Sequence, residues 1–252
     1  LTAASEIQVR PVRWAWAGRM ALSTLALLAG REGVGKTLLA YTLAADITKG
    51  KLEGVFIGVP KPVIVCATED SWEHTIVPRL MAAGADLGLI YRVDAVTTSG
   101  TECALSLPVD LAELAAVVAD IGAALVILDP LLSRLASTID THKDAEVRQA
   151  LEPLSKLADA AHCTVLGLIH VNKSTGGDLL TSVMASRAFT AVARTVLFVV
   201  RDAEDEHRRL VGVAKNNLGR VDLPALMFRV KEVMVADSAE GPVMTGQLAW
   251  AG

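Results

Sequence analysis

The chain has 252 residues, of which 52% are hydrophobic, and this is enough for one substantial core with small appendages. The net charge of −4 and the isoelectric point near 5.8 exclude an overall basic footprint for nucleic acid, so any such contact has to be local. The sequence has no signal-peptide pattern, no apolar run near the roughly 18 residues of a spanning helix and no CxxC pair among its cysteines, which favours a soluble protein of the reducing cytoplasm.

In chain order, short apolar runs alternate with Ala-rich helical stretches, as expected of a parallel sheet covered by helices. We predict strands at 24–29, 62–68, 124–129, 164–170 and 194–200, and helices at 36–49, 71–83, 110–121 and 144–162. The patterns at 208–215 and 225–235 indicate strands joined by turns without helices, and hence an antiparallel extension at one sheet edge.

The organisation that we expect is an α/β fold, a mainly parallel sheet flanked by helices, with a lead-in segment over residues 1–20 and one domain over residues 21–252. The start at Leu1 leaves open that the chain is an excerpt of a longer polypeptide. The charged stretch RDAEDEHRR, residues 201–209, is more typical of a solvated hairpin tip than of a binding site.

The stretch GREGVGKT, residues 30–37, fits a phosphate-binding loop between a strand and a helix. Glycines let the backbone turn successive N–H groups toward phosphate oxygens, Lys36 can reach the β and γ oxygens, and Thr37 can supply a Mg²⁺ ligand. Average composition would produce the pattern by chance in about one chain in a hundred of this length. We therefore predict ATP or GTP binding with Mg²⁺ at Gly30, Glu32, Gly33, Val34, Gly35, Lys36, Thr37 and Leu38.

Carboxylates follow two of the predicted strands. LVILDP places Asp129 at a strand end, where it can hold Mg²⁺, although a residue in front of Pro130 can also be an ordinary cap. VIVCATED places Glu69 and Asp70 at the same carboxyl edge, where one can orient the attacking water and the other can cap the helix at Ser71. We assign Mg²⁺ binding to Asp129, catalysis to Glu69 and capping to Asp70.

A third strand, TVLGLIH, ends at His170. A polar side chain at this position can contact the γ-phosphate and convert its loss into movement of the following loop. A lone histidine at a strand end is more often structural, and only its place beside the Asp129 strand favours a functional role.

These motifs in this order resemble the RecA-like P-loop ATPases, and more narrowly the RepA-type and DnaB-type hexameric replicative helicases. The similarity covers roughly residues 12 to 232 and consists of a lead-in with Trp14, Trp16 and Arg19, followed by GREGVGKT, ATED, LVILDP, LIHVNK, SVMASRAFTAVAR and VAKNN. The resemblance implies a homo-oligomer, in the form of a hexameric ring, that hydrolyses ATP with Mg²⁺ and binds single-stranded DNA. It also implies that Glu69 activates water, that His170 senses the γ-phosphate and that Lys215 reaches the neighbouring subunit's nucleotide.

By the same resemblance, the loops after Asp129 and after Asn172 line a central channel and contact the DNA. The cations available for this contact are Arg134, Lys143, Lys173 and Arg187. Solvated loop charges are an equally good interpretation of each of them. Without the other motifs, Lys215 would be interpreted as an edge-strand lysine that opposes aggregation.

Two positions depart from the family pattern. Asn217 stands where DnaB-type helicases carry an arginine finger two residues after the lysine, so Arg220 or Arg194 would have to substitute for it. Ala185 stands where these families tend to have a glycine, and this difference would alter the mobility of the second DNA loop.

Three functions are compatible with the motifs. The first is an oligomeric helicase or translocase of replication, driven by ATP. The second is a RecA-like module that uses ATP as an assembly switch in regulation or recombination, and Asn217 slightly favours it. The third, a small-molecule kinase, ranks lowest because the segment 130–150 is too poor in arginine for a phosphate lid.

Overall fold

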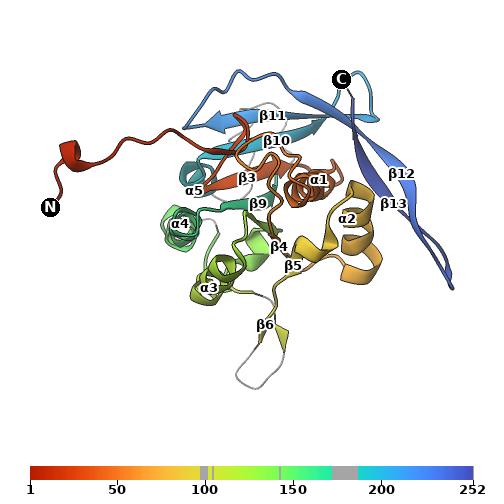
Figure 1. Ribbon diagram of the computed structural model, residues 1–252, viewed down its shortest axis with the longest axis horizontal. Coiled ribbons are helices and arrows are strands. Elements are labelled where there is room, and N and C mark those ends of the chain that lie inside the picture. The colour runs from red at the N-terminus through yellow and green to blue at the C-terminus, as the bar shows by residue number, and fades with distance from the viewer. Residues whose placement is uncertain (97–101, 104, 142, 172–186, 252) are drawn as a thin grey trace.

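The computed structural model describes residues 1–96, 102–103, 105–141, 143–171 and 187–251 (Figure 1). Its centre is a nine-stranded sheet with the order β13-β12-β11-β10-β3-β9-β8-β4-β5. The strands from β10 to β5 in this order are parallel to one another, and β11, β12 and β13 add antiparallel pairs at one edge. The predicted α/β fold with an antiparallel C-terminal extension is therefore confirmed.

The predicted elements form close to their expected bounds. The strands are β3 (Thr24–Gly30), β4 (Val63–Ala67), β8 (Leu125–Asp129), β9 (Thr164–His170), β10 (Thr195–Arg201), β11 (Arg208–Asn216) and β12 (Leu226–Ser238). The helices are α1 (Lys36–Thr48), a π-helical turn Trp72–Ile76 that continues into α2 (Val77–Ala83), α3 (Leu111–Ile121) and α4 (Asp144–Ala160).

Several elements were not expected from the sequence. They are the short strands β1 (Trp14–Trp16), β2 (Met20–Ala21), β5 (Ile90–Arg92), β6 (Ala95–Val96) and β7 (Glu102–Cys103), the helix α5 (Arg187–Val192) and the long strand β13 (Gly241–Trp250). Three 3₁₀ turns, Ala4–Glu6, Leu87–Leu89 and Leu132–Arg134, complete the described structure.

The core has two halves, one on each face of the sheet. Because side chains alternate along a strand, Ala26 and Leu28 of β3 pack in the half that includes α1 and α2, whereas Leu25 and Leu27 pack in the half that includes α3, α4 and α5. Figure 1 shows the two groups of helices on opposite sides of the sheet. Burial on both faces explains why the central strands are continuous apolar runs.

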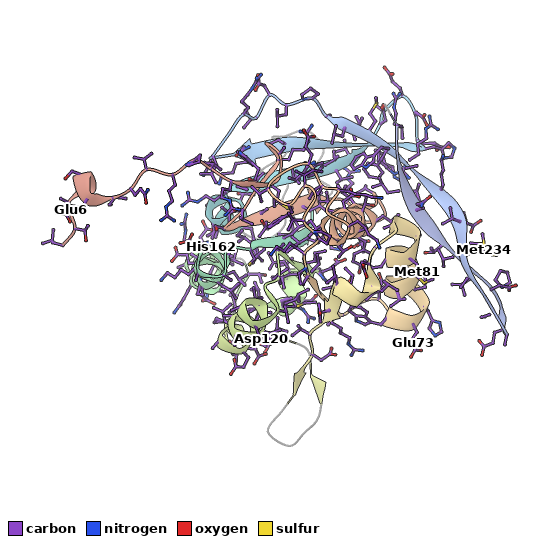
Figure 2. All side chains as sticks on the ribbon, viewed as in Figure 1. Glu6, Glu73, Met81, Asp120, His162 and Met234 are labelled. Carbon is purple, nitrogen blue, oxygen red and sulfur yellow. The ribbon has the colours of Figure 1, made fainter. Side chains whose placement is uncertain are left out.

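The hairpin of β12 and β13 extends beyond the rest of the sheet (Figure 1). Its near part packs on α2, where the Gln247 amide donates a hydrogen bond to the Ala82 carbonyl. Trp250, at the end of β13, lies edge-on to Phe228 with the ring centres 6.1 Å apart. Met234 lies on the projecting part and is 61% exposed (Figure 2).

The lead-in segment packs partly in the same core. Ala15, Trp16 and Met20 of the β1-β2 hairpin are buried, and the Arg19 guanidinium lies 5.5 Å from the centre of the Trp16 ring. Residues 1–13 are exposed and extend away from the body (Figure 1). No helix in the described ranges is both long enough and apolar enough to cross a membrane.

Candidate nucleotide-binding site

Four parallel strands bring the predicted nucleotide residues to one edge of the sheet. Gly30 at the end of β3 pairs with His170 at the end of β9, and Ala67 at the end of β4 pairs with Asp129 at the end of β8. A cavity of about 370 Å³ opens there. It is lined by Gly33, Gly35, Lys36, Thr37, Leu38, Ala67, Glu69, Asp70, Arg79, Asp129, His170, Arg209 and Val230.

The phosphate loop depends on glycine at several positions. Gly33 and Gly35 have φ angles of +68° and +95°, in the left-handed region that other residues rarely adopt. Gly35 is also the N-cap of α1, so the positive end of the helix dipole faces the cavity. At Gly30 the reason is close packing, because a Cβ would lie 2.6 Å from the Val199 carbonyl oxygen.

Two other residues of the predicted loop do not line the cavity. The Val34 side chain is buried and packs against Gly30, so only its backbone could contact a phosphate. Glu32 is exposed, but its charge acts on the Lys36 ammonium.

The Lys36 ammonium is held at the base of the cavity and is 5% exposed. Its Nζ donates hydrogen bonds to the carbonyl oxygens of Gly30 and Arg31, both at 2.9 Å, and lies 3.2 Å from Nδ1 of His170. Burial lowers the pKa of Lys36, while the charges of Asp129, Glu32 and Glu69 oppose this effect. A strongly hydrated cation held by carbonyl dipoles is well prepared to bind phosphate oxygens instead.

Thr37 and Asp129 form the pair that fits a magnesium ion. The Thr37 hydroxyl donates a 2.9 Å hydrogen bond to Oδ2 of Asp129, so a hydroxyl and a carboxylate oxygen lie side by side at the cavity. Oxygen ligands of this kind suit Mg²⁺, which keeps most of its water shell. Burial raises the pKa of Asp129 to about 6, although the Thr37 hydrogen bond and Lys36 lower it. A bound cation would reverse this penalty.

Glu69 and Asp70 lie at the same rim with different partners. Glu69 is exposed and lines the cavity, while Oδ2 of Asp70 accepts a 2.7 Å hydrogen bond from Nη1 of Arg79 in α2. The capping role predicted for Asp70 is wrong, because Ser71 is the N-cap and its hydroxyl oxygen accepts from the His74 amide. Asp70 therefore forms an ion pair with Arg79 instead of capping the helix.

His170 lies directly beside Lys36. Burial and the Lys36 charge lower the pKa of His170, so the imidazole is neutral at pH 7. With Nδ1 facing a protonated amine, the tautomer that satisfies the contact carries its proton on Nε2. His170 is thus in a position to respond to the charges that surround Lys36.

Arginines at the rim were missed from the sequence. Arg79 and Arg209 line the cavity, although Arg209 belongs to the stretch that we interpreted as a solvated hairpin tip. Glu204, Glu206 and His207 of that tip are indeed largely exposed. The strand register explains why Arg209 nevertheless lines the cavity, because β10 pairs with β3 next to the phosphate loop and Arg209 pairs with the last residue of β10.

The four cations predicted to contact DNA differ in their surroundings. The prediction for Arg134 is corrected, because Arg134 is 3% exposed and hydrogen-bonded to Thr68 and is therefore not a surface cation. Lys143 is exposed and ion-paired with Glu146 and Asp140. Lys173 lies outside the described residues, as do Asn172 and Ala185. Only the backbone of Arg187 is described, as the first residue of α5.

Lys215 lies at the opposite end of β11 from the cavity. Its Nζ donates to the carbonyl oxygens of Thr190 at 2.5 Å and Ala193 at 2.8 Å, at the C-terminal end of α5. Burial and the nearby Arg194 charge lower the pKa of Lys215. The amide of Asn217 donates a 2.9 Å hydrogen bond to the Arg194 carbonyl, so Arg194 lies across the strand ladder from Asn217.

The alternative cation, Arg220, is already engaged. Its Nε and Nη2 donate to the two carboxylate oxygens of Asp222 at 2.9 and 2.8 Å. By contrast, Arg194 is exposed, and its guanidinium has no ion pair or hydrogen bond within the described part of the chain.

The gathering of a phosphate loop, a Thr–Asp pair and polar strand ends at one edge of such a sheet defines a RecA-like P-loop ATPase. The chain belongs to the AAA domain family, whose profile matches residues 1–176. Among solved structures, one described as an ATPase domain has a similar fold, with a TM-score of 0.62, 15% sequence identity and coverage of 82% of this chain and 81% of that chain. No curated protein matches this chain in sequence.

The predicted RecA-like P-loop ATPase fold is confirmed by these comparisons, and the class implies a bound nucleotide, usually with Mg²⁺. The family match contains the phosphate loop, Glu69, Asp129 and His170, whereas Lys215 and Arg194 lie beyond it. The roles of the individual residues stay predictions.

Proposed function

We propose that the chain forms a homo-oligomeric ring that hydrolyses ATP at sites between its subunits and moves along single-stranded DNA in replication. The proposal is carried by one observation, the distance on a single subunit between the nucleotide cavity and the cations Lys215 and Arg194. The cavity supplies one half of an ATPase site, and the two cations fit the half that a neighbour would supply.

The argument rests on strand geometry. Arg209 lines the cavity, and Lys215 follows it six residues later on the same strand, β11. Across a register shift, Arg209 and Lys215 pair with Arg201 and Val196, which are five residues apart on β10. At a rise of about 3.4 Å per residue, their backbones are about 17 Å apart. A lysine side chain is too short to cover this distance, and Lys215 is turned toward α5. If Lys215 contacts a nucleotide at all, that nucleotide belongs to another subunit.

Arg194 also supports a site shared between subunits, and it is a candidate for the arginine finger that is missing at Asn217. It lies beside Lys215 and across the ladder from Asn217, and it has no described carboxylate partner. Two adjacent cations without an anion repel each other, and a phosphate would relieve this repulsion. We therefore assign the second trans-acting cation to Arg194 rather than to Arg220, which is neutralised by Asp222.

Each residue of the cavity then has a separate task. When bound, Mg-ATP supplies the phosphoryl group and the metal charge that phosphoryl transfer requires. Thr37 and Asp129 would hold the magnesium ion, and Lys36 would bind phosphate oxygens. Glu69, at the open rim, would orient and deprotonate water. His170, in contact with Lys36, would transmit the state of the site to the chain that follows β9.

A module that uses ATP as an assembly switch, without movement on DNA, is the second candidate. It is favoured by the state of two proposed DNA contacts, since Arg134 is buried and Lys143 is ion-paired. It uses the same cavity and the same residues within it.

Steady-state ATP hydrolysis with and without single-stranded DNA separates the two candidates. It is measured at low salt over a range of protein concentrations, with the oligomeric state determined in parallel and Lys36→Ala as the blank. We expect severalfold stimulation by DNA, together with a rate per subunit that rises steeply with concentration. Hydrolysis that ignores DNA in a preparation shown to be oligomeric would leave the ATP-switched module as the better function.

A further inference from the structure

Arg134 is a buried cation without a carboxylate partner among the described residues. It ends the 3₁₀ turn Leu132–Arg134 that follows Asp129, and only 3% of it is exposed. Its Nη2 donates a 2.5 Å hydrogen bond to the hydroxyl oxygen of Thr68, and its Nε is buried without a hydrogen-bond partner in the part of the chain that the structure describes. Burying a guanidinium with so few partners costs free energy, so the arrangement calls for an explanation other than stability.

The turn holds Arg134 firmly against β4. Leu131 is fully buried and its amide donates to the Leu168 carbonyl of β9 at 2.9 Å. The Arg134 carbonyl accepts a 2.7 Å hydrogen bond from the Leu107 amide. With its backbone fixed from both sides, Arg134 has a defined place from which its side chain reaches the end of β4.

The partner of Arg134 is the residue directly before Glu69. Thr68 is exposed, and among the described residues its contacts besides Arg134 are limited to a long backbone interaction, 3.4 Å from its amide to the Asp129 carbonyl. Burial lowers the pKa of Arg134, and Cys66 and Glu69 oppose this effect, so Glu69 lies within electrostatic range of the guanidinium. An arginine stays protonated even under such burial.

We propose that Arg134 is a positioning residue for ATP hydrolysis, which holds the Thr68 hydroxyl and thereby sets the place of the Glu69 carboxylate at the cavity rim. The inference rests on the proposed role of Glu69 as the group that orients water. Because Arg134 belongs to the segment after Asp129, it joins that segment, through Thr68, to the residue that carries the proposed catalytic carboxylate. Loss of the contact changes how fast bound ATP reacts and leaves ATP binding by the phosphate loop intact.

The test compares variants that differ by single groups. Thr68→Val removes the hydroxyl at nearly constant shape, and Thr68→Ser keeps it. Arg134→Met removes the buried charge but keeps much of the side-chain volume. For each variant, kcat at saturating Mg-ATP, the Kd of a fluorescent ATP analogue and the Tm are measured.

We expect kcat to fall by about tenfold to a hundredfold in Thr68→Val and Arg134→Met, because small displacements of a catalytic group have effects of this size. The Kd stays within about twofold, since the phosphate loop is untouched. Thr68→Ser restores kcat. The Tm of Arg134→Met does not fall, because the cation that is removed has one hydrogen-bonded partner among the described residues. The double variant Thr68→Val/Arg134→Met is no slower than either single variant, because both remove one contact.

Other results overturn the inference. A wild-type kcat in Thr68→Val, or effects that multiply in the double variant, would mean that the hydrogen bond does not position Glu69. A fall in Tm with unchanged kcat would make Arg134 a structural residue only. Failure of the proposed function has a different signature, namely wild-type protein without hydrolysis above the Lys36→Ala blank, or full activity in Glu69→Gln.

Discussion

At the scale of single residues, folding and function place opposite demands on the protonation state of Asp129. The fold buries its carboxylate, and this burial raises its pKa from the ordinary 3.8 to about 6. A magnesium ion, by contrast, binds the ionised form. The free energy that the ionised carboxylate costs in the metal-free protein is therefore available to favour metal binding.

This conflict predicts that Asp129→Asn stabilises the protein in EDTA while it removes ATP hydrolysis. The folded carboxyl has the higher pKa, so the free energy of unfolding of the wild type decreases as the pH rises through the interval from about 4 to about 6. Asparagine keeps an oxygen for the Thr37 hydroxyl and has no such ionisation. At pH 7.5 we expect a gain of about 1–3 kcal/mol in chemical denaturation.

The gain should shrink as the pH is lowered toward 5, because the wild-type carboxyl then becomes protonated. An equal or lower stability of Asp129→Asn at pH 7.5, without metal, would contradict the assignment of Asp129 as a penalised buried carboxylate.

Residue types and spacing were sufficient to place several of the predicted site residues beside one cavity, but not Arg79 and Arg209, and the roles of these residues stay predictions. Asp129 and His170 end strands β8 and β9, and Lys36 and Thr37 begin the helix after β3. Parallel strands bring their carboxyl ends to one edge of the sheet. The errors arose where two partners compete. Asp70 could cap a helix or pair with Arg79, and spacing along the chain does not reveal which contact is made.

At the scale of elements, the turn after β8 and the strand β9 depend on each other. Gly167 of β9 lies against Leu131, and a Cβ on Gly167 would come within 2.7 Å of the Leu131 side chain. The glycine therefore lets the turn that carries Asp129 and Arg134 sit close to the sheet. This is the reason for a glycine inside an otherwise apolar buried strand.

The two positions should show strong coupling in a double-mutant cycle. Gly167→Ala overpacks the site and should cost about 1–3 kcal/mol, and Leu131→Ala leaves a cavity and should cost about 2–5 kcal/mol. The double variant provides space for the new methyl group, so its loss should be smaller than the sum by about 1 kcal/mol or more. Additive losses in urea denaturation would show that the two residues do not share one packing space.

Helices and strands were predicted correctly where burial in the core alone determines the pattern of apolar residues. The central strands are apolar on both faces, and their bounds were predicted within about two residues. β13 was missed because Gly241, Pro242 and Gly246 interrupt its alternation, and its pairing with β12 is what makes it a strand. The burial of Arg134 was missed for a similar reason, because it depends on the fixed turn at Leu131 rather than on local sequence.

At the scale of the whole molecule, the cavity lies at the carboxyl ends of the parallel strands, near the Arg209 end of β11, whereas Lys215 lies near the other end of β11 with Arg194 beside it. The low net charge does not oppose contact with DNA in a ring, because a local cluster of cations is repeated by every subunit. If the ATPase site consists of two halves from neighbouring subunits, an isolated subunit should hydrolyse ATP slowly. Arginine residues that complete such sites in trans are worth about 10³–10⁵ in rate.

The most direct test of this account mixes two inactive variants. Lys36→Ala lacks the phosphate-loop half, and Lys215→Ala/Arg194→Ala lacks the cation half. In randomly mixed equimolar oligomers, one interface in four has both halves intact, so about a quarter of the wild-type ATPase rate should return. Mixing Lys36→Ala with a variant that carries all three substitutions is the control and should restore nothing. If verified mixed oligomers of the two variants stay inactive, the ATPase site is not shared between subunits and the account is wrong.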